Sequence, residues 1–520
     1  MTTDDNDLDR ALALGMGLAY HAARQPDSEA IVSHFGDRTY AELNNRTNQL
    51  VRCLRERGVG PGSAVAIVAR NCSEFVEALS SATRGGFRFT PINFHLTAEE
   101  VGYIVNDCEA EAVIYDGGLG TGASALMSAP DCRVRLSMRE PIEGFEDYEE
   151  ALSGMCVSDI PDPQHGSAMF YTSGTTGRPK GVRRHGQPNP SSASARLTGE
   201  SPNTVSLCTG PMYHGAPFAT NVTTPLNAGS KLVLMDSWDA EETLRLIERH
   251  GVTHTHMVAT MFHRLLQLPA ETKRKYDTSS LRFVLHGATP CPVHVKHAII
   301  NWLGPIVYEY FSATEGGSIY FIDSENWLRK PGSVGTTLQP ENTRILDETG
   351  SDVQSGQIGK LFFKTPSHGR FEYFKSPEKT ASSYRGDWFT LGDMGYLDEE
   401  GFLYLTGRSA ETIISGGVNV YPQEIDDALL QHEAVFDVCT VGVPNDEWGE
   451  EVKSVVQLAT GNAQSPELAR ELLDHAKTLL PKFKQPRSVD FVEDLPRMSS
   501  GKVKRNAVRS TYWTSENRDI

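Results

Sequence analysis

A loop rich in glycine and hydroxyl groups occupies residues 171–181, where the sequence reads YTSGTTGRPKG. Glycine lets backbone N–H groups approach an anion closely, hydroxyls donate to phosphate oxygens, and lysine neutralises their charge. It is not a Walker A loop, because Pro179 precedes the lysine and Gly181 stands where a magnesium-binding hydroxyl should be. The loop therefore predicts phosphate binding through Thr172, Ser173, Gly174, Thr175, Thr176 and Lys180.

Four further stretches combine charged side chains with glycine. They read YFSATEGG at 310–317, DWFTLGDMG at 387–395, GRSAETIISGGVNVYP at 407–422 and PRMSSGKVKR at 496–505. Together with the first loop, and in this order, they resemble the adenylate-forming superfamily of acyl-CoA synthetases, luciferase-like enzymes and peptide-synthetase adenylation domains. The resemblance covers about residues 30 to 510 and is greatest to a bacterial-type acyl-CoA synthetase for fatty or bulky acids.

The resemblance implies a site for ATP and Mg²⁺. Thr314 is expected at the α-phosphate, and Glu315, with Thr172, is expected to hold the magnesium ion. The chemistry agrees, because Mg²⁺ prefers carboxylate oxygens beside the phosphates of its nucleotide.

The nucleoside has its own expected contacts. The resemblance places Phe311 against adenine, beside Gly287 and Ala288. It assigns the ribose hydroxyls to Asp393, whose carboxylate has two acceptor oxygens, and a second ribose or phosphate contact to Arg408.

Three parts of the sequence are assigned to the reaction itself. The resemblance gives Lys502 the catalytic role in adenylation, where a lysine reduces the repulsion between a carboxylate and a triphosphate. His214 is expected between the acyl and thiol tunnels, as a gate or orienting group. The turn Ser415, Gly416 and Gly417 is expected beside the thiol of coenzyme A, where glycine permits close backbone approach.

The chain has 520 residues, which exceeds the size of a single hydrophobic core. Alternating β-rich and helical patterns predict an α/β fold. We expect a large multi-subdomain α/β domain at 1–407, a hinge at 408–411 and a small mobile α+β domain at 412–520. The resemblance implies that the small domain rotates between the two half-reactions. Its pivot falls on Ala410, where the family usually has Asp or Lys.

One β-α-β unit can be predicted in detail. Residues 231–235 predict a strand, Asp239 and Glu242 a capping box, Gly251 a left-handed helix end, and 252–258 a second strand. Two histidines, at 254 and 256, would face the same way on that strand. No carboxylate or cysteine accompanies them at ligand spacing, so packed or pocket-lining histidines are favoured over a metal site.

The overall composition narrows the function classes. The 67 acidic residues exceed the 49 basic ones, and the net charge of −18 argues against a nucleic-acid partner. The sequence has neither a signal-peptide pattern nor an apolar run of about 18 residues. Its eight cysteines are far apart, which argues against a zinc knuckle or a disulfide framework. We therefore expect a cytoplasmic protein, and its oligomeric state cannot be read from the sequence.

The resemblance implies an acid–CoA ligase that converts a carboxylic acid, ATP and coenzyme A into acyl-CoA, AMP and pyrophosphate. Small residues near the expected acyl pocket favour a medium- or long-chain fatty acid, or a bulky steroid-type acid: Gly215, Ala216, Ala288, Ala313, Gly316 and Gly317. Two alternatives remain open. In the first, the enzyme transfers the acyl group to a carrier-protein thiol. In the second, which Ala410 and Leu391 suggest, the chain is a catalytically impaired nucleotide-binding regulator, and a luciferase-like oxygenase is a more distant option.

Overall fold

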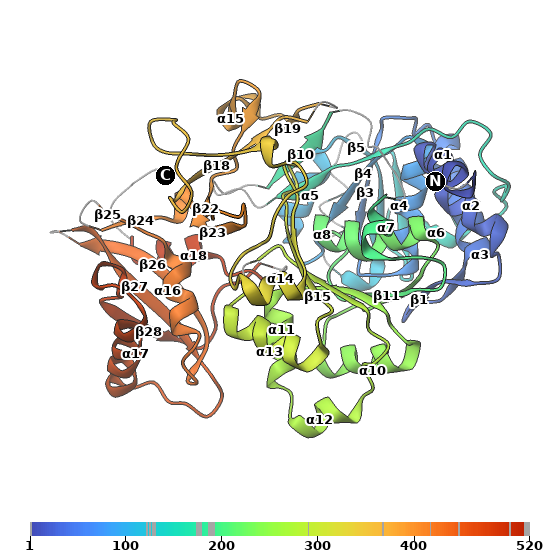
Figure 1. Ribbon diagram of the computed structural model, residues 1–520. Helices are drawn as coiled ribbons and strands as arrows, with labels where there is room; N and C mark the ends of the chain where they lie inside the picture. Colours follow the sequence, from blue (N-terminus) through green and yellow to red (C-terminus); the bar gives the residue numbers. More distant parts are fainter. Residues whose placement is uncertain are drawn as a thin grey trace.

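The computed structural model describes residues 3–120, 123, 126, 132–172, 179–185, 193–289, 291–366, 369–415, 418–445, 448–498 and 501–513. Figure 1 shows the N-terminal elements at one side of the molecule and the C-terminal elements at the other, with the middle of the chain between them. Among the described residues, no helix is both long and apolar enough to cross a bilayer. All eight cysteines are free thiols.

A parallel sheet lies in the N-terminal part. Its strands are β3 (Ala64–Val68), β4 (Arg88–Ile92), β5 (Ala110–Asp116), β6 (Val134–Met138), β7 (Glu146–Asp147) and β8 (Ser167–Ala168), in the order β7-β6-β5-β3-β4-β8. The accompanying helices are α1 (Thr3–Ala13), α2 (Gly17–Arg24), α3 (Tyr40–Glu56), α4 (Ser73–Gly85), α5 (Ala98–Asp107), η1 (Gly117–Leu119) and α6 (Tyr148–Leu152). The apolar runs SAVAIV at 63–68 and AVIY at 112–115 predict buried strands, and the structure confirms them as β3 and β5.

A second sheet of eight strands forms the centre of the molecule. It contains β1 (Glu29–Ser33), β2 (Arg38–Thr39), β11 (Val205–Cys208), β12 (Lys231–Leu234), β13 (His254–Met257), β14 (Phe283–His286), β15 (Val307–Phe311) and β16 (Tyr320–Ile322). The order is β16-β15-β14-β13-β11-β12-β1-β2. From β1 to β15 the pairs are parallel, and only β2 and β16 pair antiparallel at the edges. Loops after parallel strands therefore meet at one edge, the usual place for a ligand site.

Helices follow the strands of this central sheet. They are α7 (Ala193–Thr198), α8 (Gly215–Pro217), the π-helix η3 (Phe218–Thr223), α9 (Thr224–Ala228), α10 (Ala240–His250), α11 (Ala259–Gln267), α12 (Ala270–Lys275), α13 (Val293–Leu303) and α14 (Ser324–Arg329). The two large sheets share one apolar core, because Ile67 of β3 and Phe75 of α4 belong to the same buried cluster as Leu232 of β12.

The predicted β-α-β unit forms β12, α10 and β13, and one detail of the prediction is wrong. Asp239 Oδ1 accepts the Glu242 N–H at 2.8 Å, but the Glu242 carboxylate pairs with Arg245 and makes no described bond back to the cap. The capping box is therefore one-sided, because the arginine one turn on attracts the carboxylate. Gly251 ends the helix with φ 61° and ψ 44°, as predicted.

Two smaller sheets cover the central one. The first joins β9 (Phe170–Thr172), β10 (Lys180–Arg184) and β19 (Phe371–Tyr373). The second contains β17 (Thr343–Leu346), β18 (Gly359–Lys364), β20 (Tyr384–Arg385), β21 (Trp388–Phe389), β22 (Asp393–Leu397) and β23 (Leu403–Arg408). Their helices are η4 (Pro340–Asn342) and α15 (Pro377–Ser383), and η5 (Ser409–Glu411) follows β23.

The C-terminal part has a sheet and core of its own. Its strands are β24 (Ile413–Ser415), β25 (Val418–Val420), β26 (Val435–Asn445), β27 (Gly449–Leu458) and β28 (Ser488–Val492). Its helices are α16 (Pro422–Leu429), α17 (Pro466–Leu479), η6 (Lys482–Lys484) and α18 (Arg505–Ser510). The sequence pattern predicts strands at 435–443, 451–458 and 488–492 and helices at 423–432 and 466–480, and the structure confirms all of them to within about three residues. The α/β fold class with a small α+β part is also confirmed. The predicted hinge at 408–411 coincides with the end of β23 and with η5, but its role as a hinge stays a prediction.

Candidate active site

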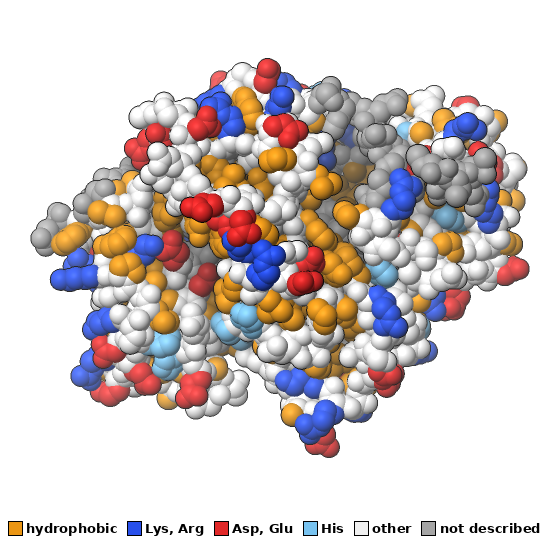
Figure 2. All heavy atoms as spheres, viewed as in Figure 1, with side chains coloured by type: hydrophobic (Ala, Val, Ile, Leu, Met, Phe, Trp, Pro, Cys, Tyr) orange, Lys and Arg blue, Asp and Glu red, His pale blue; other side chains and the backbone are white. Residues whose placement is uncertain are grey.

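A cavity of about 1980 Å³ lies where loops of the central sheet meet the two smaller sheets and the C-terminal part. Its wall includes residues from β9, β10, α8, β13, β15, β22 and β23, and from the loop 496–505. Figure 2 shows hydrophobic side chains gathered around a hollow at the centre of this face. The cavity is therefore built from segments far apart in the sequence.

The structure brings most of the predicted site residues to this cavity. Those in its wall are Thr172, Lys180, His214, Ala288, Phe311, Thr314, Glu315, Asp393, Arg408 and Lys502. Gly287 and Ser415 do not belong to the wall. The remaining six lie outside the described residues: Ser173, Gly174, Thr175, Thr176, Gly416 and Gly417. Convergence in one cavity does not test the roles assigned above, which stay predictions.

Gly287 supports the wall from behind. A Cβ at this position would lie 2.6 Å from Cε1 of Tyr310, so only glycine lets the backbone pack against that ring. The next residue, Ala288, lines the cavity with φ 66°, a left-handed conformation uncommon for alanine. The expected contact of Gly287 with adenine stays a prediction.

A carboxylate and a guanidinium face the cavity from neighbouring strands. Asp393 of β22 is in register with Arg408 of β23, and Arg408 Nε donates to Asp393 Oδ1 at 3.1 Å. Burial lowers the pKa of Arg408, but Asp393 and the nearby Glu411 raise it more, so its net shift is upward. The guanidinium is therefore a fixed positive charge in the wall.

Hydrogen bonds from Tyr373 and Arg184 hold the Thr314-Glu315 corner. The Tyr373 hydroxyl donates to Glu315 Oε1 at 2.9 Å. The Arg184 guanidinium donates from Nε to the Thr314 carbonyl at 2.8 Å. These bonds fix the backbone and the carboxylate from the side of the three-stranded sheet.

The donor set around Glu315 bears on the implied magnesium ion. Among the described residues there is no group of three or more His, Cys, Asp and Glu side chains that could enclose a metal. Glu315 and the Thr172 hydroxyl face the same cavity, and Mg²⁺ normally takes only one or two carboxylates, with phosphates and water completing its shell. The residues therefore fit a magnesium ion that arrives with a nucleotide, and not a resident one.

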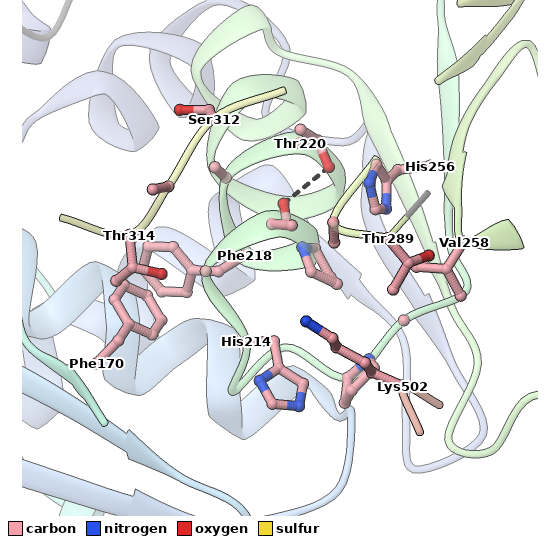
Figure 3. Close-up of a pocket in the computed structure, with 18 of the residues that line it drawn as sticks. Phe170, His214, Phe218, Thr220, His256, Val258, Thr289, Ser312, Thr314 and Lys502 are labelled. Carbon is pink, nitrogen blue, oxygen red and sulfur yellow. Dashed lines mark hydrogen bonds between the residues drawn. The ribbon is translucent and has the colours of Figure 1, made fainter. Parts of the chain in front are cut away.

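Lys502 reaches the cavity from the C-terminal part on a tight turn. Gly501, with φ 84°, donates its N–H to Met498 O at 2.8 Å, and the Met498 N–H donates back to Lys502 O at 2.7 Å. Figure 3 shows the Lys502 side chain extending into the cavity between His214 and Thr289. Burial and then the charge of Arg408 lower the pKa of Lys502.

Burial favours the neutral form of two histidines in the cavity wall, His214 and His256. His214 precedes α8, and burial lowers its pKa to about 4. Burial has the same effect on His256, to about 4. Both histidines of β13 line the cavity wall, and His254 Nε2 bonds the Thr198 carbonyl at 2.9 Å, which agrees with the expectation of packed or pocket-lining histidines.

Three cavity residues were missed from the sequence. Arg184 belongs to the basic run that follows the first loop, and Glu411 to the predicted hinge, so proximity to known motifs was an available signal. Tyr373 lies 58 residues from its partner Glu315. No local pattern marks it, because the contact depends on how β19 pairs with β10.

Comparison with known proteins agrees with this geometry. Residues 18–370 match the family described as AMP-binding enzyme, and residues 424–502 match the AMP-binding enzyme C-terminal domain. The chain belongs to the AMP-binding enzyme family. This membership confirms the resemblance to the adenylate-forming superfamily.

This AMP-binding enzyme is similar over nearly its whole length to curated and solved proteins. It is 30% identical over 503 residues to the indoleacetate–CoA ligase of Aromatoleum aromaticum, covering 94% of this chain and 96% of that one. It is 27% identical to the fatty acid–[acyl-carrier-protein] ligase ScoC of Streptomyces coeruleorubidus, covering 96% and 97%. The structure of ATP-bound MatB from Rhodopseudomonas palustris superposes with a TM-score of 0.82 at 29% identity, covering 96% and 99%.

Proposed function

We propose that this enzyme is an ATP-dependent acid–CoA ligase. A carboxylate oxygen attacks the α-phosphorus of ATP, the bond to pyrophosphate breaks, and an acyl-adenylate forms. The sulfur of coenzyme A then attacks the acyl carbonyl, and the bond to AMP breaks. The observation that carries the proposal is the convergence of Lys502, Thr314 and the Asp393–Arg408 pair on one cavity.

The roles in adenylation follow from charge. Attack on a triphosphate brings two anions together, so cations near the α-phosphate lower the barrier. Lys502 and Arg408 supply two such charges, and Thr314 adds a hydroxyl. Asp393 accepts the ribose hydroxyls and holds the nucleoside, with Phe311 and Ala288 beside the adenine. No enzyme nucleophile is required.

Glu315 and Thr172 would hold the magnesium ion. When bound, the ion neutralises charge on the phosphate oxygens. The Tyr373 hydroxyl keeps the Glu315 carboxylate pointing along the wall, so its orientation is set before the nucleotide arrives.

The thioester step requires another arrangement of the C-terminal part. In the present one Lys502 is in the cavity, whereas Ser415 lies in β24 and is not in the wall. We propose that this part turns about residues 408–411, which brings 415–417 toward the thiol beside neutral His214.

The acyl pocket is wide and largely apolar. Phe170 and Phe218 stack edge to face with ring centroids 4.9 Å apart, and Figure 3 shows both in the wall opposite Val258. Ala216 and Ala313 add little bulk. This shape supports a medium- or long-chain fatty acid, or a bulky steroid-type acid, over a short one.

Transfer to a carrier protein is the second candidate, because ScoC is named for that acceptor. Mass spectrometry distinguishes the two. Purified enzyme with Mg·ATP, coenzyme A and a panel of fatty, aromatic and steroid acids should yield acyl-CoA and AMP. Acyl-adenylate with no acyl-CoA would point to a carrier protein. An impaired nucleotide-binding regulator would show no acid-dependent ATP–pyrophosphate exchange, which would refute the ligase proposal.

A further inference from the structure

The wall of the cavity continues along β13, away from Lys502. Val258, His256 and His254 alternate along this strand and all line the cavity. The Val258 end lies beside the Lys502 loop, since a Cβ at Gly501 would lie 3.1 Å from Thr260 Oγ1. Four residues of strand span about 13 Å. An acyl group that starts near Lys502 and follows β13 therefore ends near His254.

A small polar cluster stands at that far end. His254 Nε2 bonds the Thr198 carbonyl at 2.9 Å, and the Thr198 hydroxyl donates to Glu200 Oε2 at 3.2 Å. Ser206 pairs in register with His254 across β11 and β13. Glu200 and Ser206 line the same cavity, so this end of the pocket carries a carboxyl and a hydroxyl.

Ser206 lacks a hydrogen bond and Glu200 lacks a charged partner within the described part of the chain. Glu200 is 9% exposed, and no cationic side chain among the described residues forms an ion pair with it. Ser206 is 1% exposed, and its Oγ has no hydrogen-bond partner in the described part of the chain. Buried polar groups are stable only when they are hydrogen-bonded. Their deficit points to a partner that comes with the ligand.

We propose that Glu200 and Ser206 recognise a hydroxyl or keto oxygen carried by the substrate acid at the end remote from its carboxylate. The inference rests on the proposed function, because it concerns the acyl group of the same reaction. It makes the substrate an oxygen-bearing extended or polycyclic acid, and not a plain fatty acid with a methyl end.

The protonation state of Glu200 favours a neutral oxygen over an ammonium group. Burial raises the pKa of Glu200 to about 8, and the Thr198 bond only partly opposes this. At neutral pH the carboxyl is mostly protonated, so it can donate a hydrogen bond to a keto or hydroxyl oxygen. A methyl group would leave Ser206 without a hydrogen bond and Glu200 with only the Thr198 hydroxyl as its partner.

The test uses three acyl-sulfamoyl-adenosines, which mimic the acyl-adenylate and cannot react. Their acyl chains are long enough to span about 13 Å and differ only in ending with hydroxyl, methyl or amine. Calorimetry on the full-length enzyme should give the hydroxyl compound an affinity on the order of tenfold above the methyl compound. Glu200→Leu should abolish this preference, and Glu200→Gln, which can still donate and accept, should keep most of it.

Each outcome bears on the inference. Equal affinities for the hydroxyl and methyl compounds in the wild type would overturn it, and so would a preference for the amine, which needs an ionised Glu200. These results do not require a folded variant, and Ser206→Ala offers a second, smaller change. Failure of the proposed function would appear separately, as absence of acid-dependent ATP–pyrophosphate exchange.

Discussion

Lys502→Ala should separate the two half-reactions of this enzyme. In the structure the lysine enters the cavity on the 496–505 loop, near Arg408 and the carboxylates Asp393 and Glu411. Replacement by alanine removes one cation from the place where the triphosphate must bind and react, while both carboxylates remain.

The size of the effect follows from the loss of one preorganised charge. Removing a single such group in a water-poor site costs about 10²–10³ in rate, or about 3–4 kcal/mol of transition-state stabilisation. Adenylation should fall by at least this factor. Thioester formation from a supplied acyl-adenylate should change by less than about tenfold, because we propose that Lys502 has left the cavity by then.

Two assays measure the two steps. Acid-dependent ATP–pyrophosphate exchange reports adenylation, and acyl-CoA formation from synthetic acyl-adenylate reports transfer. Lys477→Ala is the matched control, since Lys477 is an exposed lysine of α17 paired only with Asp474. Its two rates should equal those of the wild type.

Two results would refute this reasoning. Equal losses in both half-reactions would mean that Lys502 acts in both or supports the fold. A loss below about tenfold in exchange would mean that the arrangement of the C-terminal part seen here is not the one that forms the adenylate.

Three further predictions concern charge. Asp393→Asn should raise the KM for ATP roughly 10–100-fold, because an ionic hydrogen-bond acceptor is lost; steady-state kinetics with unchanged KM would contradict its ribose role. Lys296→Met should lower the free energy of unfolding by about 3–5 kcal/mol, because Glu309, 5% exposed, loses the ammonium group that its carboxylate contacts. Denaturant unfolding measures this loss of stability, and adding Glu309→Leu should restore most of the lost free energy. The rate of adenylation should fall as the pH rises, and the fall should begin below pH 10.5, the ordinary pKa of a lysine, because the pKa of Lys502 is lowered and the lysine works only when protonated. A rate of ATP–pyrophosphate exchange that stays constant up to pH 10.5 would exclude Lys502 as the titrating group.

Local patterns in the sequence determined much of this protein. The five motifs identified the superfamily, and helices and strands such as α17 and β28 fall within a residue or two of their predicted ranges. These features depend on neighbours in the chain, on turn chemistry and on the spacing of apolar residues. Where a nearby residue competed, as Arg245 does for Glu242, the local prediction failed in its detail.

Only the tertiary structure decided how the motifs meet. Arg184 bonds the Thr314 carbonyl across 130 residues, and Tyr373 bonds Glu315 across 58. Gly287 turned out to pack against Tyr310 and not to line the cavity. Lys502 lies inside the cavity while Ser415 lies away from it, which depends on how the C-terminal part is oriented. The polar end at Glu200 emerged in the same way, because a side chain's burial and partners are set by segments that only folding brings together.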